Sequence, residues 1–158
     1  MAGDHARLDG LLARSLEGPD VARAAFGAFR GGLLRHIGLE ETVLLPALSG
    51  WDAALAAKLR LEHGAITNLL VPEPTRAIAA ALRAILAPHN RAEEKPGGLY
   101  DAVDALPAAE VERLAARLRG APDLPLRPYS KRPQALEAAK RAMARAGFDW
   151  DACAGGGS

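Results

Sequence analysis

All four histidines of this chain fall on apolar stripes of helical period, and this arrangement restricts the fold more than any other feature. Apolar residues recur at every third or fourth position in the segments 5–16, 26–44, 55–70 and 78–93. Because the apolar stripe of a helix faces the core, each histidine is predicted to point inward from its own helix. The histidines on these stripes are His5, His36, His63 and His89.

The spacing of the histidines indicates how the helices pack. Positions 5, 36, 63 and 89 are separated by 31, 27 and 26 residues, and each interval suits one helix and a short loop. Alternate helices of an up-down bundle run in opposite directions, so these intervals can bring all four imidazoles to one level. Alanine and leucine are abundant and aromatic residues make up only 4%, which favours helices over sheets. We therefore predict an all-α protein built on an up-down four-helix bundle.

Two of the histidines precede a glutamate by four positions, in the pairs His36–Glu40 and His89–Glu93. Residues i and i+4 are neighbours on a helix, so each pair delivers an imidazole and a carboxylate to one place. One such pair alone is more often a surface contact worth about 0.3 kcal/mol. Four imidazoles and two carboxylates at one level of a core instead indicate metal binding, with two ions sharing both carboxylates. The predicted metal ligands are His5, His36, Glu40, His63, His89 and Glu93.

Other polar residues lie close to this set in the sequence. We interpret Glu41 and Glu94 as outer-shell or surface groups, and Glu62 either as a hydrogen-bond partner or as a surface residue. We interpret Tyr100 as a packing residue, with a hydroxyl near the metals as the alternative. Cys153 is the only cysteine, so the chain can form neither an intrachain disulfide nor a CxxC site.

The chain beyond Glu94 is predicted to add short helices to the bundle. "KPGG" ends the fourth helix, and residues 99–106 and 107–120 read as shorter helical pieces. A connector with four prolines, 121–133, precedes a last amphipathic helix and a flexible tail at 154–158. We predict a metal-binding bundle over residues 1–120, followed by a C-terminal segment over residues 121–158.

The order of the predicted ligands resembles the hemerythrin-like HHE cation-binding domain. The matching segments lie within residues 1–106 and are "DHARLDGLL", "HIGLEETVLLPAL", "LEHGAITNLL" and "HNRAEEKPGGLY". The resemblance implies an up-down four-helix bundle around a non-haem di-iron centre with a bridging oxide or hydroxide. Members of the family bind dioxygen, and some sense oxygen, react with peroxide or nitric oxide, or take part in the repair of iron centres.

The chain departs from the oxygen-carrying hemerythrins at two positions. Those proteins have a histidine four positions after the third-helix histidine, where this chain has Thr67. They also have an aspartate five positions after the fourth-helix histidine, where this chain has Glu94. Four histidines and two glutamates instead resemble the iron-centre repair branch. The expected cofactor is two iron ions, with manganese or zinc as alternatives.

From this resemblance we expect a di-iron protein that binds or reacts with dioxygen, peroxide or nitric oxide in sensing, storage or stress response. One alternative is an oxidoreductase or oxygenase that turns over peroxide, nitric oxide or an organic substrate. The other is an iron reservoir or a metal-stapled interaction module, with residues 121–150 docking on a protein partner of unknown identity.

Charge and hydropathy indicate where such a protein works. The formal net charge is +1, so we expect no nucleic-acid partner. No stretch reaches the roughly 18 apolar residues that a membrane span requires, and no secretory signal is visible at the N-terminus. We expect a cytoplasmic protein without a membrane partner.

Overall fold

The computed structural model describes residues 2–48, 50–122 and 124–155, and within these residues it contains helices but no β-strand. This confirms the prediction of an all-α protein. The elements are α1 (Ala2–Arg14), α2 (Arg23–Leu39), the π-helix η1 (Glu40–Leu44), α3 (Leu45–Ala47), α4 (Ala53–Leu69), α5 (Arg76–Glu94), α6 (Leu99–Asp104), α7 (Ala108–Gly120), α8 (Pro133–Arg145) and α9 (Trp150–Ala154).

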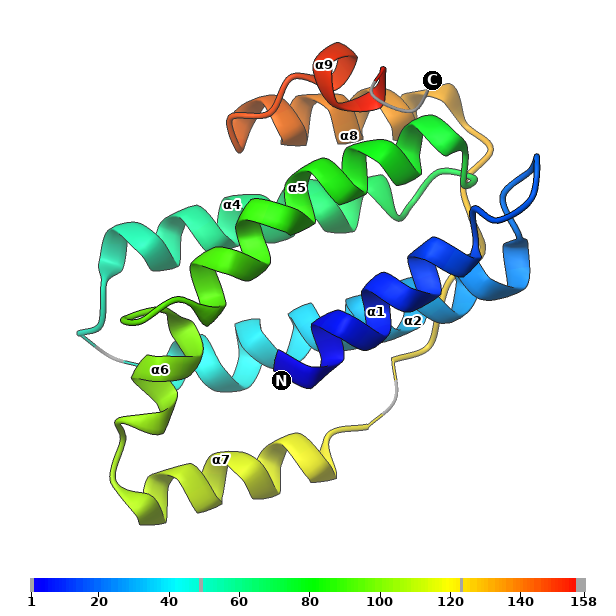
Figure 1. The fold of residues 1–158 in the computed structure, drawn as a ribbon. Helices are drawn as coiled ribbons and strands as arrows, with labels where there is room; N and C mark the ends of the chain where they lie inside the picture. Colours follow the sequence, from blue (N-terminus) through cyan, green and yellow to red (C-terminus); the bar gives the residue numbers. More distant parts are fainter. Residues whose placement is uncertain (1, 49, 123, 156–158) are drawn as a thin grey trace.

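The four helices that contain the histidines lie side by side. Figure 1 shows α1, α2, α4 and α5 running in alternate directions along the chain, with α1 packed on α2 and α4 packed on α5. Helix α8 packs along α4, and α9 packs on α5. Helices α6 and α7 follow the C-terminal end of α5, and α7 contacts η1. The alternating directions bring the N-terminal part of α1 beside the C-terminal part of α2.

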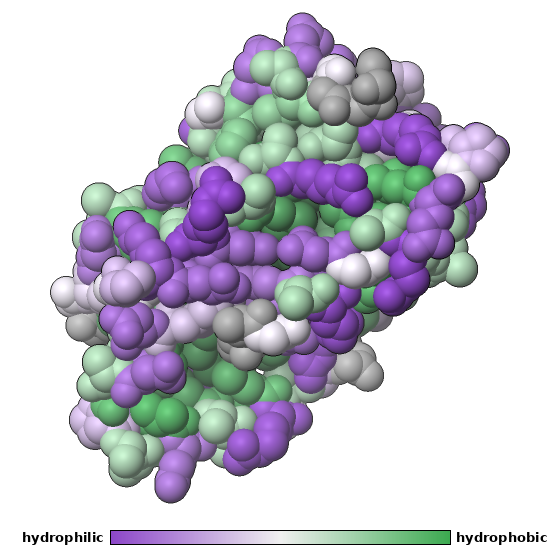
Figure 2. All heavy atoms as spheres, viewed as in Figure 1, coloured by the Kyte–Doolittle hydropathy of each residue, from purple (hydrophilic) through white to green (hydrophobic). Residues whose placement is uncertain are grey.

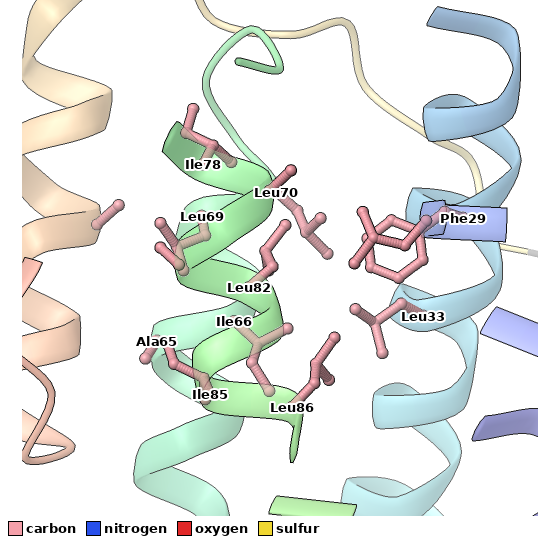
Figure 3. Packing of buried hydrophobic residues seen from close by; sticks show 14 of the residues in the cluster. Phe29, Leu33, Ala65, Ile66, Leu69, Leu70, Ile78, Leu82, Ile85 and Leu86 are labelled. Carbon is pink, nitrogen blue, oxygen red and sulfur yellow. The ribbon is translucent and has the colours of Figure 1, made fainter. Parts of the chain in front are cut away.

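The main core lies between α2, α4 and α5. Figure 3 shows Phe29 and Leu33 of α2 pointing toward Leu70, the residue that follows α4, and toward Leu82 and Leu86 of α5. All five side chains are buried, because the apolar stripe of each helix faces the others. On the face viewed in Figure 2, hydrophilic atoms instead form a band across the middle of the molecule.

Helix α8 contributes to this same core. Ala139, Ala142 and Met143 are buried in the cluster formed by α2, α4 and α5. The C-terminal residues therefore cover a face of the bundle in their own chain. The predicted boundary at residue 120 stays a prediction, and residues 156–158 of the predicted tail lie outside the described residues.

The helix ends explain where α4 and α5 begin. The side chains of Asp52 and Thr75 cap these helices by accepting hydrogen bonds from the backbone N–H groups of Leu55 and Ile78, at 2.9 and 3.2 Å. Asp4 lies in the first turn of α1, which begins at Ala2. An aspartate in this position is favourable, since it faces the positive end of the helix dipole.

Candidate metal centre

The structure brings the six predicted ligands together in the core. Each has at most 5% of its surface exposed, and they come from α1, α2, η1, α4 and α5. Their donor atoms form two groups, each with all atoms within 4.8 Å of one another, and the two groups share both glutamates. One group consists of His5, His36, Glu40 and Glu93, and the other of Glu40, His63, His89 and Glu93.

The two shared carboxylates lie between the pairs of histidines. In Glu40, Oε1 is 3.0 Å from Nε2 of His36, and Oε2 is 3.3 Å from Nε2 of His63. In Glu93, Oε2 is 3.3 Å from Nε2 of His5, and Oε1 is 3.1 Å from Nε2 of His89. Each carboxylate therefore turns one oxygen toward each group, which is the arrangement that a bridge between two ions requires.

The imidazoles pair in the same way on both sides. His5 and His36 are edge to face with ring centroids 4.8 Å apart, and His63 and His89 are edge to face at 4.9 Å. The Nε2 atoms of His5 and His36 lie 3.0 Å apart. Two ligands bound to one ion at about 2.1 Å and at right angles to each other are also about 3.0 Å apart. The first group thus has the donor separation of a single metal site.

A second layer of carboxylates faces the outer nitrogen of each imidazole. Nδ1 of His5, His63 and His89 lies 2.6, 2.6 and 2.9 Å from a glutamate oxygen, and Nδ1 of His36 lies 3.8 Å from an aspartate oxygen. Metal-binding histidines typically donate their second N–H to such a group, which fixes the tautomer and leaves Nε2 free for the metal. The acidic partners are Glu94, Glu41, Glu62 and Asp4, respectively.

These contacts show whether Glu41, Glu62 and Glu94 lie beside the ligands or on the surface. Glu41 and Glu94 lie just outside the ligand groups, as predicted. Glu62 is fully buried against His89 and also pairs with Lys58 at 3.2 Å, so it is a hydrogen-bond partner rather than a surface residue. The sequence placed Glu62 next to His63, but the structure joins it to a histidine of the neighbouring helix.

Several buried polar atoms of the cluster make no hydrogen bond within the described part of the chain. They include Oε2 of Glu40, Nε2 of His63 and Oε1 of Glu93, all of which point into the second group. A buried polar atom without a partner costs about 1–3 kcal/mol. A cation among these donors would satisfy all three, so the residues fit a bound metal.

The electrostatics of the cluster without metal favour a proton on His63. Burial alone lowers the pKa of His63, but hydrogen bonds to Glu40, Glu41 and Glu93 outweigh it and raise this pKa to about 11. Burial alone raises the pKa of Glu40, but hydrogen bonds to His36 and His63 outweigh it and lower this pKa to about 2. The carboxylates are thus ready to bind a cation, whereas His63 must first lose its proton.

The π-helix was not predicted, and it explains how adjacent residues reach one histidine. The sequence predicts a continuous stripe over 26–44, but α2 ends at Leu39 and η1 continues from Glu40 to Leu44. A π-turn holds more residues than an α-turn, so consecutive side chains diverge less. As a result Glu40 faces Nε2 of His63 while Glu41 reaches its Nδ1 at 2.6 Å.

Tyr100 fulfils both interpretations drawn from the sequence. It is half-buried and packs against an apolar cluster with Leu99 and Leu114, and its hydroxyl donates to Oε1 of Glu40 at 2.6 Å. The turn between α5 and α6 places the tyrosine back over Glu93, seven residues earlier in the chain. The sequence shows that Tyr100 lies near the motif, but not the direction of that turn.

No protein-family model, curated protein or solved structure matches this chain. Among the described residues, no helix combines the length and the apolar character that crossing a membrane requires. In its described residues the protein is all-helical, with two overlapping buried groups of histidine and glutamate that could hold metal ions.

Proposed function

We propose that this chain is a hemerythrin-like protein that holds two iron ions and binds or reacts with a small ligand such as dioxygen, peroxide or nitric oxide. The observation that carries the proposal is the pair of donor groups that share Glu40 and Glu93. The other four ligands are the histidines, two in each group. Imidazole and carboxylate donors without thiolate suit iron, with manganese and zinc as the alternatives.

The chain's own residues prepare this site for a redox-active metal. The outer carboxylates hold Nε2 of His5, His63 and His89 toward the cluster, and the two shared glutamates supply negative charge in a buried place. Each group offers four donor atoms, two nitrogens and two oxygens, which is fewer than the six that iron accepts. When bound, the iron pair would supply exchangeable positions for a small ligand and electrons for its reduction.

Solvent reaches the edge of the cluster from one side. A groove of about 540 Å³ is lined by His5 and Glu94, together with Ala6, Asp9, Ala87, Asn90 and Arg91. His5 itself is only 5% exposed, so the groove ends at the imidazole without opening the cluster. This access suits a diatomic molecule or peroxide better than a large organic substrate. Turnover and iron storage stay alternatives for the same site.

Metal analysis tests the proposal directly. Protein expressed in iron-rich medium and purified without added metal should contain two irons per chain. His63→Ala should lose metal, because it removes one donor from the second group. Thr67→Ala is the matched control in α4, since the Thr67 hydroxyl donates to the carbonyl oxygens of His63 and Gly64 in its own helix. One tightly bound zinc per chain, unchanged in iron-rich medium, would contradict the proposal.

A further inference from the structure

The hydroxyl of Tyr100 lies close to every donor atom of the first group. Its oxygen is 2.6 Å from Oε1 of Glu40 and 3.3 Å from Oε2 of Glu93. It is also 3.1 Å from Nε2 of His5 and 3.3 Å from Nε2 of His36. These four atoms belong to the four residues of that group, so the hydroxyl oxygen faces the place that they enclose.

These separations are those of neighbouring ligands around one ion. Adjacent positions of an octahedral ion with bonds of about 2.1 Å are about 3.0 Å apart. Hydrogen bonding alone accounts for at most three of the four neighbours, because a tyrosine hydroxyl donates one proton and accepts up to two. That proton serves Glu40 at 2.6 Å, and the oxygen still has Glu93 and two imidazole nitrogens around it.

Helix α6 holds the tyrosine in this position. Leu99, the neighbouring residue, is fully buried in a second apolar cluster with Leu44, Leu59 and Leu114. A mostly apolar cavity of about 280 Å³ between α6 and α7 is lined in part by Tyr100. The hydroxyl therefore reaches the cluster from a fixed helix and not from a mobile loop.

The two ligand groups differ in their contacts with tyrosine. Within the described chain, no tyrosine hydroxyl is hydrogen-bonded to His63 or His89, the histidines of the second group. The other tyrosine, Tyr129, packs against Phe26 and below the guanidinium of Arg30, away from the glutamates. The asymmetry thus comes from Tyr100 alone.

We propose that Tyr100 is a fifth protein ligand, bound as phenolate, of the ion held by His5 and His36. This inference rests on the proposed di-iron function. On binding, the phenol oxygen forms a bond to the ferric ion and its proton leaves to solvent, with no change in the oxidation state of the iron. The two ions are then unequal, and an external ligand binds at the ion held by His63 and His89, which has only four protein donors.

Visible absorption and resonance Raman spectra of the ferric protein test this assignment. A phenolate bound to ferric iron gives a charge-transfer band and enhanced tyrosine ring vibrations, which shift when ring-deuterated tyrosine is incorporated. We expect both signals in the unaltered protein. Tyr100→Phe should lose them while retaining two irons, and Tyr129→Phe is the control that should keep them. Azide titration should show one binding site in the parent and a second one in Tyr100→Phe.

The outcomes separate this inference from the proposed function. Two irons per chain without tyrosine vibrations in the parent overturn the ligand assignment and leave the di-iron proposal standing. Fewer than two irons in the parent overturn the proposed function and the assignment with it. If Tyr100→Phe fails to fold, the label-dependent vibrations of the parent protein still decide, because they need no variant.

Discussion

At the scale of single residues, His63 makes contacts through both of its ring nitrogens. Nε2 of His63 faces the shared glutamates, while its Nδ1 lies 2.6 Å from Glu41. A carboxylate in this position orients the ring and makes Nε2 a stronger donor. The charge of Glu41 therefore contributes to metal binding without contacting the metal.

Glu41→Gln should weaken metal binding in the second group about 10–100-fold while two irons still bind at saturation. The amide keeps an oxygen that accepts from His63, but the negative charge is lost. Competition with a chelator measures the change. Glu112→Gln, on the exposed surface of α7, is the matched control. Equal chelator resistance in the two variants would show that the Glu41 charge has no effect on the site.

Metal binding should release protons at neutral pH. The pKa values of His5 and His89 are raised like that of His63, because hydrogen bonds to glutamates outweigh the opposing effect of burial. Protons therefore compete with metal until the pH approaches about 11 for His63, so the apparent metal affinity rises with pH. Zinc titration in weakly buffered solution with an indicator dye should detect at least one proton released per chain. Constant affinity between pH 6 and pH 8 would contradict this expectation.

At the scale of elements, the junction between α5 and α6 determines the position of Tyr100 relative to Glu93. Gly98 is the N-cap residue of α6, and a β-carbon there would overlap the backbone carbonyl oxygens of Ala92 and Glu93 at the end of α5. Glycine is therefore required at position 98 by the close approach of these two backbone segments. The same approach carries the tyrosine hydroxyl to the cluster.

Gly98→Ala should lower the free energy of unfolding of the metal-free protein by about 1–3 kcal/mol, because backbone must move to admit the methyl group. The movement should also displace α6 and weaken the Tyr100 contact. Urea unfolding gives the free energy. Gly27→Ala, within α2 and with open space around the added atom, is the control and should be neutral or slightly stabilising. Similar unfolding midpoints for both variants would mean that the junction tolerates the methyl group.

At the scale of the whole molecule, the cluster links α1, α2, α4 and α5 through charged groups in a buried place. Metal binding to the folded chain stabilises it by mass action, about 2.7 kcal/mol at a hundredfold excess over Kd. Metal removal should therefore lower the melting temperature by about 5–10 °C for a protein of this size. Calorimetry with and without chelator measures the shift, and Glu40→Ala should not respond to chelator. A metal-free protein that melts at the metal-bound temperature would show that these residues do not bind the metal.

The packing of α8 predicts that the C-terminal segment unfolds together with the bundle. Met143 is fully buried in the main core, so Met143→Ala should destabilise the whole chain by about 2–5 kcal/mol in one cooperative transition. Arg141→Ala, exposed on the same helix, should change the stability little. A separate transition for the C-terminal segment, with the bundle unaffected, would support a boundary at residue 120.

The sequence by itself determined the helical class and the residues of the cluster. The reason is local: an inward histidine and a glutamate four positions later follow from helical period alone, as in His36–Glu40 and His89–Glu93. The tertiary structure decided which histidines pair, which helix supplies Glu62 to His89, and how the π-turn presents Glu41. It also placed the Tyr100 hydroxyl among the donors. These contacts join residues of different elements, so they depend on how helices turn and pack and not on spacing within one helix.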